Sequence, residues 1–244
     1  MFPIDHSEMR RRLQFFLSLL TLIAPLAAQD PGRHPVSGRP YAAVMGVGGA
    51  PWLERAEREN EERPRLAVRL LRLQPGMKVA DIGAGSGYYA ELLSRAVGPT
   101  GRVYAVDIQP GMIRLIEERV RRQSLTNVSP VLGSVADPKL PSGAIDLALL
   151  VDVYHEFANP QIMLRQIRSA LRPDGRLVLL EFRKEDPAIP IRAEHKMSVE
   201  EARIEIEPEG YRLDAVIEDL PWQHILIFRK NDGPKTSETK TSER

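Results

Sequence analysis

Cysteine is absent from the 244 residues. Disulfide bonds, thiolate metal sites and cysteine nucleophiles are therefore excluded. Five histidines are present, but they are scattered along the chain and show no metal-ligand spacing. The sequence accordingly predicts no metal site.

The chain also has little net charge. Its 34 Lys and Arg residues nearly balance 33 Asp and Glu residues, which leaves +1 at pH 7. Binding to nucleic acid generally needs a basic face, so no nucleic-acid partner is expected. With 43% hydrophobic residues, the length suits one good-sized globular domain plus end segments. Nothing in the sequence specifies an oligomeric state.

Long uninterrupted apolar runs are missing as well. The run from Leu13 to Leu26 is broken by Pro25 and is too short for a comfortable membrane span. Three arginines precede it and Ala27-Ala28 follow it, a pattern typical of a secretory signal peptide. We expect residues 1–28 to direct export to the periplasm or the medium, with no stable membrane span after signal removal. Without a functional signal, the protein would be cytoplasmic.

The most informative segment is VADIGAGSG, from Val79 to Gly87. It predicts a buried strand that carries Asp81 and then turns through three glycines into a helix, where side chains would keep the backbone away from a ligand. Asp107 follows twenty residues after Gly87, at the end of the next predicted strand. A carboxylate there can bind both hydroxyls of a ribose. The segment therefore predicts a nucleoside-cofactor site at the carboxyl ends of a parallel sheet.

Two features of phosphate binding are absent from this loop. Its G-x-G-x-G spacing places Tyr88 where the dinucleotide fingerprint has its third glycine, and no G-K-[ST] follows. Asp81 beside the loop would repel a pyrophosphate but would suit an ammonium group. S-adenosylmethionine offers an ammonium, a ribose and an adenine without a phosphate, so it is the expected cofactor. The alternatives are a nicotinamide cofactor and a turn that binds no ligand.

From roughly Leu66 to Lys230 the chain resembles class I S-adenosylmethionine-dependent methyltransferases. VADIGAGSG is similar to their first motif, VYAVDIQPGMI to their second strand with its ribose-binding acid, and LRPDGRLVLLEFR to their fifth strand, close to quinone-biosynthesis C-methyltransferases. LVDVYHEFANP and EDPAIPIRAEHKMS are similar to a bacterial branch of methyltransferases, here with an N-terminal signal peptide. Arsenite methyltransferases resemble this fold but rely on cysteines. The resemblance implies methyl transfer to an O, C or N atom of a small-molecule acceptor.

Strands and helices alternate from Lys78 onward, which implies a doubly wound parallel sheet with right-handed crossovers. The expected strands are 78–82, 102–106, 128–132, 144–151, 176–182, 211–218 and 223–228, and the expected helices between them are 87–97, 110–123 and 159–171. Ser198 and Glu201 fit a capping box that opens a further helix. The predicted fold is α/β, a Rossmann-like doubly wound seven-stranded sheet, mostly parallel, with an antiparallel C-terminal strand.

Two segments flank this predicted methyltransferase domain, residues 66–230. Residues 29–65 are expected to form an N-terminal arm and a lid helix, with helical stretches at 51–60 and 65–73. The second stretch either covers the cofactor, as in the resembling family, or packs on the core. Residues 231–244 are polar and rich in Ser, Thr and Lys, which predicts a disordered tail.

Ligands of open α/β sheets bind beyond the carboxyl ends of the strands. Ile108 and Met112 lie where they can pack on adenine, although core packing is an equal alternative for Met112. In many relatives an Asp stands at the position of Ser134, and Asp137 is near enough to replace it. The predicted cofactor-binding residues are Asp81, Gly83, Ala84, Gly85, Gly87, Asp107, Ile108, Met112, Ser134, Val135, Asp137 and Asp152.

The predicted catalytic residues are Tyr154, His155 and Glu156, directly after the fourth strand. His155 can take a proton from the acceptor because the pKa of histidine lies near neutrality. Three alternatives stay open. His155 can serve only to bond backbone or orient Tyr154, Glu156 can hold His155, and methyl transfer can depend mainly on proximity without a strong base.

Glu181, His195 and Lys196 are the predicted substrate-binding residues, in the region that lines the acceptor pocket of relatives. His195 and Lys196 suit an anionic or phenolic acceptor, and a solvated loop is the alternative. Two other functions remain. An isoaspartate-repair protein methyltransferase shares a Gly-Tyr pair like Gly87-Tyr88, and a non-catalytic S-adenosylmethionine-binding protein would retain the cofactor site alone.

Overall fold

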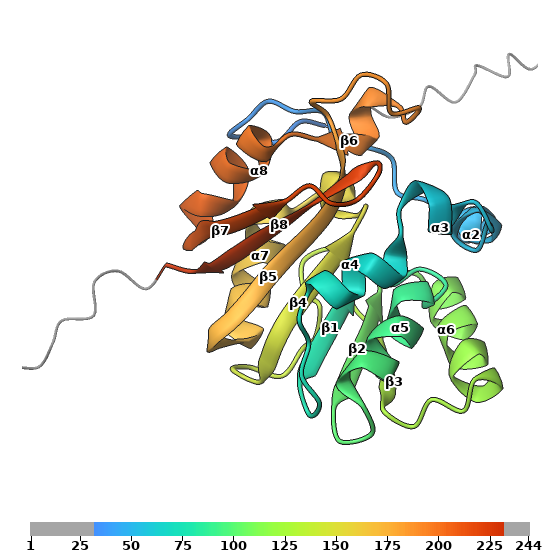
Figure 1. Cartoon of the computed structure of the whole chain (residues 1–244). Coiled ribbons are helices and arrows are strands. Elements are labelled where there is room, and N and C mark those ends of the chain that lie inside the picture. The colour runs from blue at the N-terminus through green and yellow to red at the C-terminus, as the bar shows by residue number, and fades with distance from the viewer. Residues whose placement is uncertain (1–31, 232–244) are drawn as a thin grey trace, which may run out of the picture. The chain divides into compact units, whose positions relative to one another are not determined.

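The computed structural model describes residues 32–231 (Figure 1). The predicted signal peptide lies outside these residues, and so does the predicted tail apart from Asn231. None of the helices within residues 32–231 combines the length and the apolar character that a bilayer span requires.

The described residues are built on one eight-stranded sheet. Its strands are β1 (Lys78–Ile82), β2 (Arg102–Asp107), β3 (Val128–Leu132), β4 (Ile145–Val151), β5 (Leu171–Arg183), β6 (Lys196–Met197), β7 (Tyr211–Ile217) and β8 (Gln223–Lys230). The order is β3-β2-β1-β4-β5-β8-β7, and β6 pairs with β5. Strands β1 to β5 are parallel, whereas β8 runs antiparallel to both of its neighbours. The predicted fold class is therefore confirmed, with the short β6 as an unpredicted addition.

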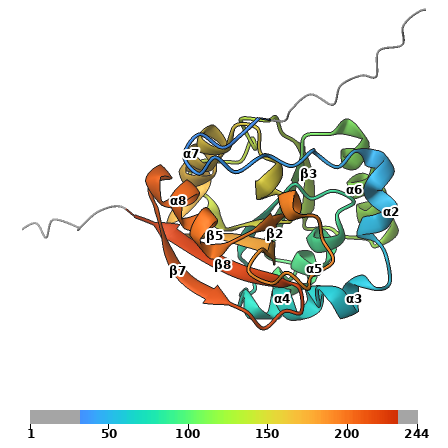
Figure 2. The ribbon, with the colours of Figure 1, turned by 90° about the horizontal axis from the view of Figure 1, so that it is seen from above.

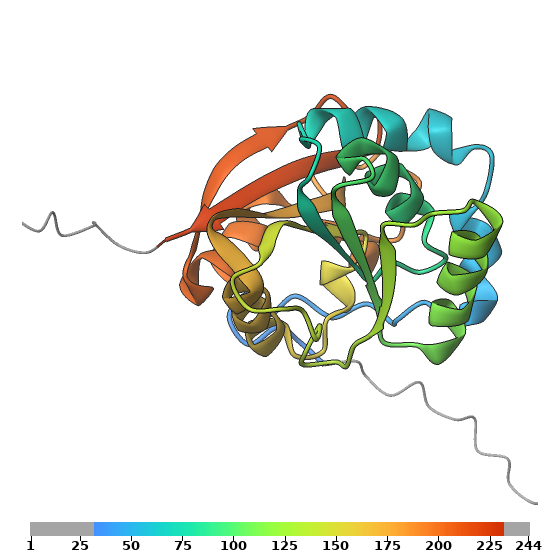
Figure 3. The same cartoon turned by 90° about the horizontal axis from the view of Figure 1, so that it is seen from below.

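Helices cover both faces of the sheet (Figure 3). Helices α4 (Pro64–Leu70), α5 (Tyr88–Val97) and α6 (Pro110–Arg122) pack on one face, and α7 (Pro160–Ala170) and α8 (Val199–Ile206) on the other. Successive side chains of a strand point to opposite faces. Accordingly, Leu147 and Leu149 join the first helical layer, whereas Ala148 and Leu150 join the second. The nearly continuous apolar run of β4 results from burial on both faces.

The start of α8 follows the prediction. Ser198 is its N-cap, the Ser198 side chain accepts from the Glu201 N–H at 3.1 Å, and the Glu201 carboxylate accepts from the Ser198 N–H at 3.0 Å. This capping box satisfies two backbone donors that the helix leaves without a partner.

The single helix predicted at 51–60 is wrong. The segment is divided between α2 (Ala50–Leu53), whose C-cap is Glu54, and α3 (Arg58–Glu61), and the short helix η1 (Val47–Gly49) precedes them. The Glu54 carboxylate contacts Ser86 and Arg119, and these tertiary contacts outweigh the helix propensity of a charged sequence. The second predicted stretch forms α4, whose Ala67 and Val68 pack on the core.

Strand β5 is longer than predicted. Pro173-Asp174-Gly175, which precede the predicted strand 176–182, lie within it, and the β4–β5 register shifts between Ile145 and Leu147. Ile145 pairs with Leu171 and Leu147 with Arg176, so the turn residues form an irregularity inside the strand.

Residues 32–49, which we call the arm, cross the end of the sheet where the parallel strands finish (Figure 2). Arg39 in the arm forms a bidentate pair with Glu205 of α8, with both N–O distances at 2.9 Å. The Ala42 N–H donates to the carbonyl of His155 at 3.0 Å. These contacts hold the arm against the segment that follows β4.

Candidate functional site

A cavity with about 1020 Å³ of empty space, partly open to solvent, lies at the carboxyl ends of β1, β2 and β4. Strand β1 lies between β2 and β4, so the chain direction across the sheet reverses at this point. Open α/β sheets bind ligands at such a reversal. The cavity is lined by Val44, Met45, Trp52, Leu53, Arg58, Ile82, Gly83, Gly85, Val106, Asp107, Ile108, Gln109, Met112, Ser134, Val135, Val151, Asp152, Val153, Glu156, Phe157, Ala158 and Met163.

The glycine loop shapes one wall of this cavity. Gly83 has φ +74° and Gly85 has φ +55°, in the left-handed region that favours glycine. A Cβ on Gly83 would lie 2.4 Å from Val153 Cγ2, and one on Gly85 would lie 2.7 Å from Leu53 Cδ1. Side chains at these positions would collide with other residues of the cavity wall. Ala84 and Gly87 belong to the same loop but do not line the cavity.

Asp107 is fixed by backbone donors. Its Oδ2 accepts from the Gly85 N–H at 3.0 Å and its Oδ1 accepts from the Gln109 N–H at 2.9 Å. Burial raises the pKa of Asp107, and these backbone hydrogen bonds act in the opposite direction. Each carboxylate oxygen can accept more than one hydrogen bond, so both can also accept from hydroxyls of a ligand.

Two buried carboxylate oxygens near the loop have no hydrogen-bond partner, Asp81 Oδ2 and Asp152 Oδ1. Burial raises the pKa of Asp81 to about 7 and raises the pKa of Asp152 well above its usual range. The other oxygen of Asp152 accepts from Gln223 Nε2 at 2.7 Å. Buried acceptors without partners are costly, so this part of the site suits a ligand that donates hydrogen bonds.

The wall formed by α2 and α3 has no counterpart among the site residues predicted from the sequence. Trp52, Leu53 and Arg58 line the cavity, and Arg58 donates to Glu62 Oε2 at 2.6 Å and to the Leu53 carbonyl at 2.9 Å. Their sequence shows only an amphipathic, charged segment, without a motif that marks a ligand wall.

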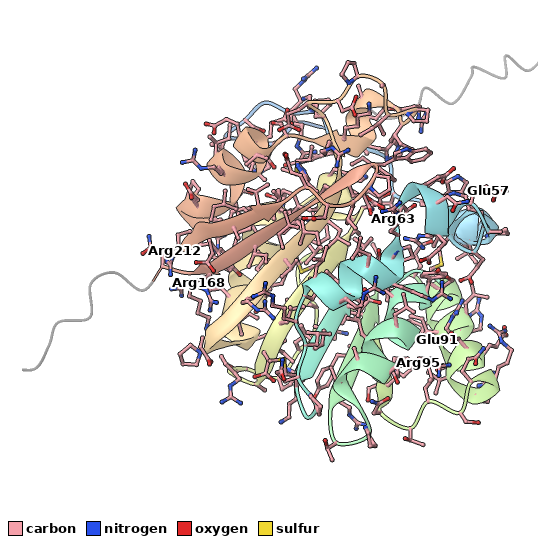
Figure 4. All side chains as sticks on the ribbon, in the orientation of Figure 1. Glu57, Arg63, Glu91, Arg95, Arg168 and Arg212 are labelled. Carbon is pink, nitrogen blue, oxygen red and sulfur yellow. The ribbon has the colours of Figure 1, made fainter. Side chains whose placement is uncertain are left out.

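Arg119 of α6 ties this wall to the glycine loop. Its guanidinium donates to the Ser86 carbonyl at 3.1 Å, to Glu91 Oε2 at 2.9 Å and to Glu54. Glu91 also pairs with Arg95 one turn later on α5 (Figure 4). The pairs with Glu54 and Glu91 favour the charged guanidinium and raise the pKa of Arg119 against the effect of burial.

The predicted adenine-contact residues divide into two groups. Ile108, Met112, Ser134 and Val135 line the cavity. Asp137 does not line it, because this exposed side chain caps its own turn by accepting from the Lys139 N–H at 2.7 Å.

The predicted catalytic segment forms the short helix η2 (Tyr154–Glu156). Its three side chains point to different surroundings. Tyr154 is fully buried among the residues beneath α7 and α8, and His155 is buried without lining the cavity. Glu156 lines the cavity, and burial raises its pKa to about 7.

His155 is held by Glu181 rather than by Glu156. Its Nδ1 lies 2.6 Å from Glu181 Oε2, and the other Glu181 oxygen accepts from the Tyr154 N–H at 3.0 Å. The Nε2 of His155 lies 3.2 Å from Nδ1 of His195, in η3 (Ala193–His195). Burial and the neighbouring His155 lower the pKa of His195. Glu181, predicted to bind substrate, is fully buried and positions His155.

Lys196 is buried in β6, away from the cavity lining. Its ammonium donates to the carbonyls of Ile189 at 2.7 Å and Asp186 at 3.1 Å. These bonds fold the loop that precedes η3, so Lys196 shapes the loop from within instead of facing a bound molecule.

Known proteins share both the sequence pattern and the fold. The family model described as "Methyltransferase domain" matches residues 73–226, more than half of the chain. Protein-L-isoaspartate O-methyltransferase of Methanothrix thermoacetophila is 29% identical over 136 residues, which cover 54% of this chain and 60% of that protein. The ubiquinone/menaquinone biosynthesis C-methyltransferase UbiE of Burkholderia multivorans is 30% identical over 112 residues, which cover 46% of each chain.

A solved structure extends the match to the whole domain. A SAM-dependent methyltransferase from Aquifex aeolicus superposes with a TM-score of 0.72 and 25% identity, over 76% of this chain and 98% of that chain. The curated relatives, by contrast, are matched over only about half of their length. The family match, the sheet order and the glycine loop with Asp107 agree, and this chain belongs to the methyltransferase domain family.

Proposed function

We propose that this protein transfers a methyl group from S-adenosylmethionine to an O, C or N atom of a small organic acceptor. The observation that carries this proposal is the cavity itself, which the glycine loop, Asp107 and Asp152 with its unpartnered Oδ1 line together. The unpartnered Oδ2 of Asp81 is buried in β1, two residues before Gly83. The matched family and the Aquifex aeolicus structure support the same cofactor.

The residues present fit that cofactor. Asp152 offers an unpartnered acceptor for an ammonium group at the cavity lining, and Asp107 offers two oxygens for ribose hydroxyls. The carboxylate of Asp81 is buried next to the loop and does not line the cavity. Ile108 and Met112 supply apolar surface for adenine. When bound, S-adenosylmethionine supplies an electrophilic methyl group on a sulfonium sulfur.

The protein itself contributes to methyl transfer mainly by positioning the methyl donor and the acceptor. Transfer to a nucleophilic atom depends on holding donor and acceptor in line, and a walled cavity does this while limiting access of water. Glu156 is the side chain of η2 that reaches this space, so we expect it to contact the acceptor. Glu181 fixes η2, and with it the position of Glu156, by its bonds to His155 and to the Tyr154 N–H.

A second candidate function is protein methylation of the isoaspartate type. It is favoured by the 29% identity to the Methanothrix thermoacetophila enzyme. An isoaspartyl peptide in a methylation assay separates the two, because a small-molecule enzyme leaves that peptide unmethylated.

The experiment that tests the proposal is calorimetric titration of the full chain with S-adenosylmethionine and S-adenosylhomocysteine. We expect both to bind, and Asp107→Ala to weaken binding on the order of 100-fold because charge-assisted hydrogen bonds to ribose are lost. Asp174→Ala is the matched control, since this carboxylate is exposed in the irregular part of β5. Absence of binding by folded protein overturns the proposal, whereas binding without turnover on any acceptor favours a non-catalytic role.

A further inference from the structure

Three side chains capable of binding a metal meet beside the cavity. Suitable ligand atoms of His155, Glu156 and His195 all lie within 4.8 Å of one another. The two histidines are 40 residues apart in sequence and come from the segments after β4 and before β6. Pairing of β6 with the end of β5 brings the second histidine to the first.

The spacing of the imidazole nitrogens suits two ligands of one ion. Metal–nitrogen bonds of about 2.0–2.1 Å place neighbouring ligands about 2.8–3.0 Å apart in octahedral geometry and about 3.3–3.4 Å apart in tetrahedral geometry. Nε2 of His155 and Nδ1 of His195 are 3.2 Å apart. A hydrogen bond between the rings has the same length, so the surroundings must separate the two interpretations.

Glu181 supplies the first of these surroundings. It lies 2.6 Å from Nδ1 of His155, and a carboxylate at this distance holds the proton on that nitrogen. The lone pair of His155 is then on Nε2, the nitrogen that faces His195. A carboxylate behind a ligating histidine is the usual outer support of protein metal sites. Its second oxygen is occupied by the Tyr154 N–H, which fixes its orientation.

Glu156 supplies the second feature of the surroundings that favours a metal ion. One of its oxygens accepts from the Met45 N–H at 3.3 Å, and the side chain lines the cavity. Two imidazoles and one carboxylate form a ligand set that leaves coordination positions open, as in catalytic zinc sites and non-haem iron sites. Because Glu156 lines the cavity, an ion at this cluster would lie at the cavity wall.

We propose that His155, His195 and Glu156 bind one divalent first-row transition-metal ion, with Glu181 as the outer support of His155. The mixed nitrogen and oxygen ligands favour such an ion over magnesium, which prefers oxygen. Resting on the proposed methyltransferase function, the open positions select an acceptor that ligates the ion through oxygen, such as a phenolate or an enolate. Coordination would stabilise the deprotonated, nucleophilic form of that oxygen.

The contact of Arg192 with His195 distinguishes a metal site from a pair of hydrogen-bonded histidine rings. Its Nη2 lies 3.2 Å from Nε2 of His195, and a guanidinium can only donate. This contact therefore places the His195 proton on Nδ1, the nitrogen that the metal needs. The Arg192 side chain is 76% exposed and also pairs with Glu194, so it can turn away. Removing Arg192 should consequently strengthen metal binding, whereas it would weaken a site made only of hydrogen-bonded rings.

The test is titration of the chelator-treated full chain with Co²⁺, followed by the visible absorption of protein-bound Co²⁺, with Zn²⁺ competition by calorimetry. We expect one ion per chain. His195→Ala should lower the affinity on the order of 100-fold or more, and Glu181→Gln about 10- to 100-fold. Arg192→Ala should bind at least as tightly as the wild type. His6→Ala is the matched histidine control, in a segment outside residues 32–231.

Two outcomes overturn the proposal. One is the absence of bound Co²⁺ and Zn²⁺ in folded wild-type protein, and the other is equal affinity in wild type and His195→Ala. If His195→Ala does not fold, Glu156→Gln tests the same site from the cavity side. S-adenosylmethionine titration of the same samples separates the proposals, because retained cofactor binding without metal binding overturns the metal site alone.

Discussion

The two walls of the cavity are built in different ways. The glycine-loop wall (residues 83–87 with Asp107) comes from two consecutive strands and is held by backbone N–H donors. The histidine wall consists of Glu156, which lines the cavity, and of His155, Glu181 and His195 behind it, and it depends on side chains from distant segments and on the arm. Local sequence determines the first, whereas long-range packing determines the second. Substitutions should therefore damage the two walls by different mechanisms.

The largest expected effect lies on the histidine wall. Arg39 pairs with buried Glu205 and also donates to the His155 carbonyl at 3.3 Å. Arg39→Ala removes the guanidinium partner of the buried Glu205 carboxylate and leaves it with its contacts to Ser37 and His34, which should lower the free energy of unfolding by about 3–5 kcal/mol. Urea denaturation measures this loss. Arg33→Ala, an exposed arginine of the same arm, is the control, and an equal loss in both variants would contradict the role of the buried pair.

A smaller effect is expected from steric conflict on the glycine-loop wall. Gly83→Ala combines left-handed backbone strain with a Cβ at 2.4 Å from Val153, and should cost about 2–3 kcal/mol as well as cofactor affinity. Gly143 has φ +58° with nothing within 4 Å of an added Cβ, so Gly143→Ala isolates the strain. The comparison fails if both variants lose the same stability, and Val153→Ala should partly rescue Gly83→Ala.

The third effect depends on pH and concerns Asp81. Its folded-state pKa of about 7 exceeds the ordinary value of 3.8, so the folded protein binds an additional proton between these values. Stability from this group is complete below about pH 4 and is lost as the pH rises through 7, at up to ~1.4 kcal/mol per pH unit. Asp81→Asn should flatten this dependence in thermal unfolding from pH 5 to pH 8. An unchanged slope would contradict the burial effect.

The smallest effect is at the α8 cap. Ser198→Ala removes the side-chain acceptor of the Glu201 N–H and should cost about 1 kcal/mol. Ser142→Ala, in an exposed loop, should leave the denaturation midpoint nearly unchanged. The two variants together measure how much the capping box, a local sequence signal, contributes to stability. If Ser198→Ala leaves the stability unchanged, packing alone sets the start of α8.

The sequence predicted a residue's role correctly where that role depends on residues nearby in the sequence. Strands β1 and β3 begin and end as predicted, and Asp107 lies beside the glycine loop because parallel strands finish at one edge. The capping box of α8 was visible for the same reason, since both of its residues lie within four positions.

Sequence was uninformative where a role depends on topology. Lys196 and Glu181 had a charge pattern that suited substrate contact, yet β5 and β6 bury both of them. The spacing of His155 and His195 gave no metal signal, because the strand pairing that joins them is not encoded by any local pattern. Trp52 and Arg58 line the cavity from either side of Glu54, whose contacts with Ser86 and Arg119 are long-range and leave no local signal in the sequence.

The arm bears on how long a molecule stays bound in the cavity, rather than on how tightly it binds. Val44 and Met45 line the cavity, and Met45 is fastened through its carbonyl to Gln109 Nε2 at 2.8 Å and through its N–H to Glu156. A molecule that leaves past Met45 must wait until these two bonds open. The time that such a molecule stays bound would then depend on how often both bonds open, because the same arm segment contacts Gln109 after β2 and Glu156 at the end of η2.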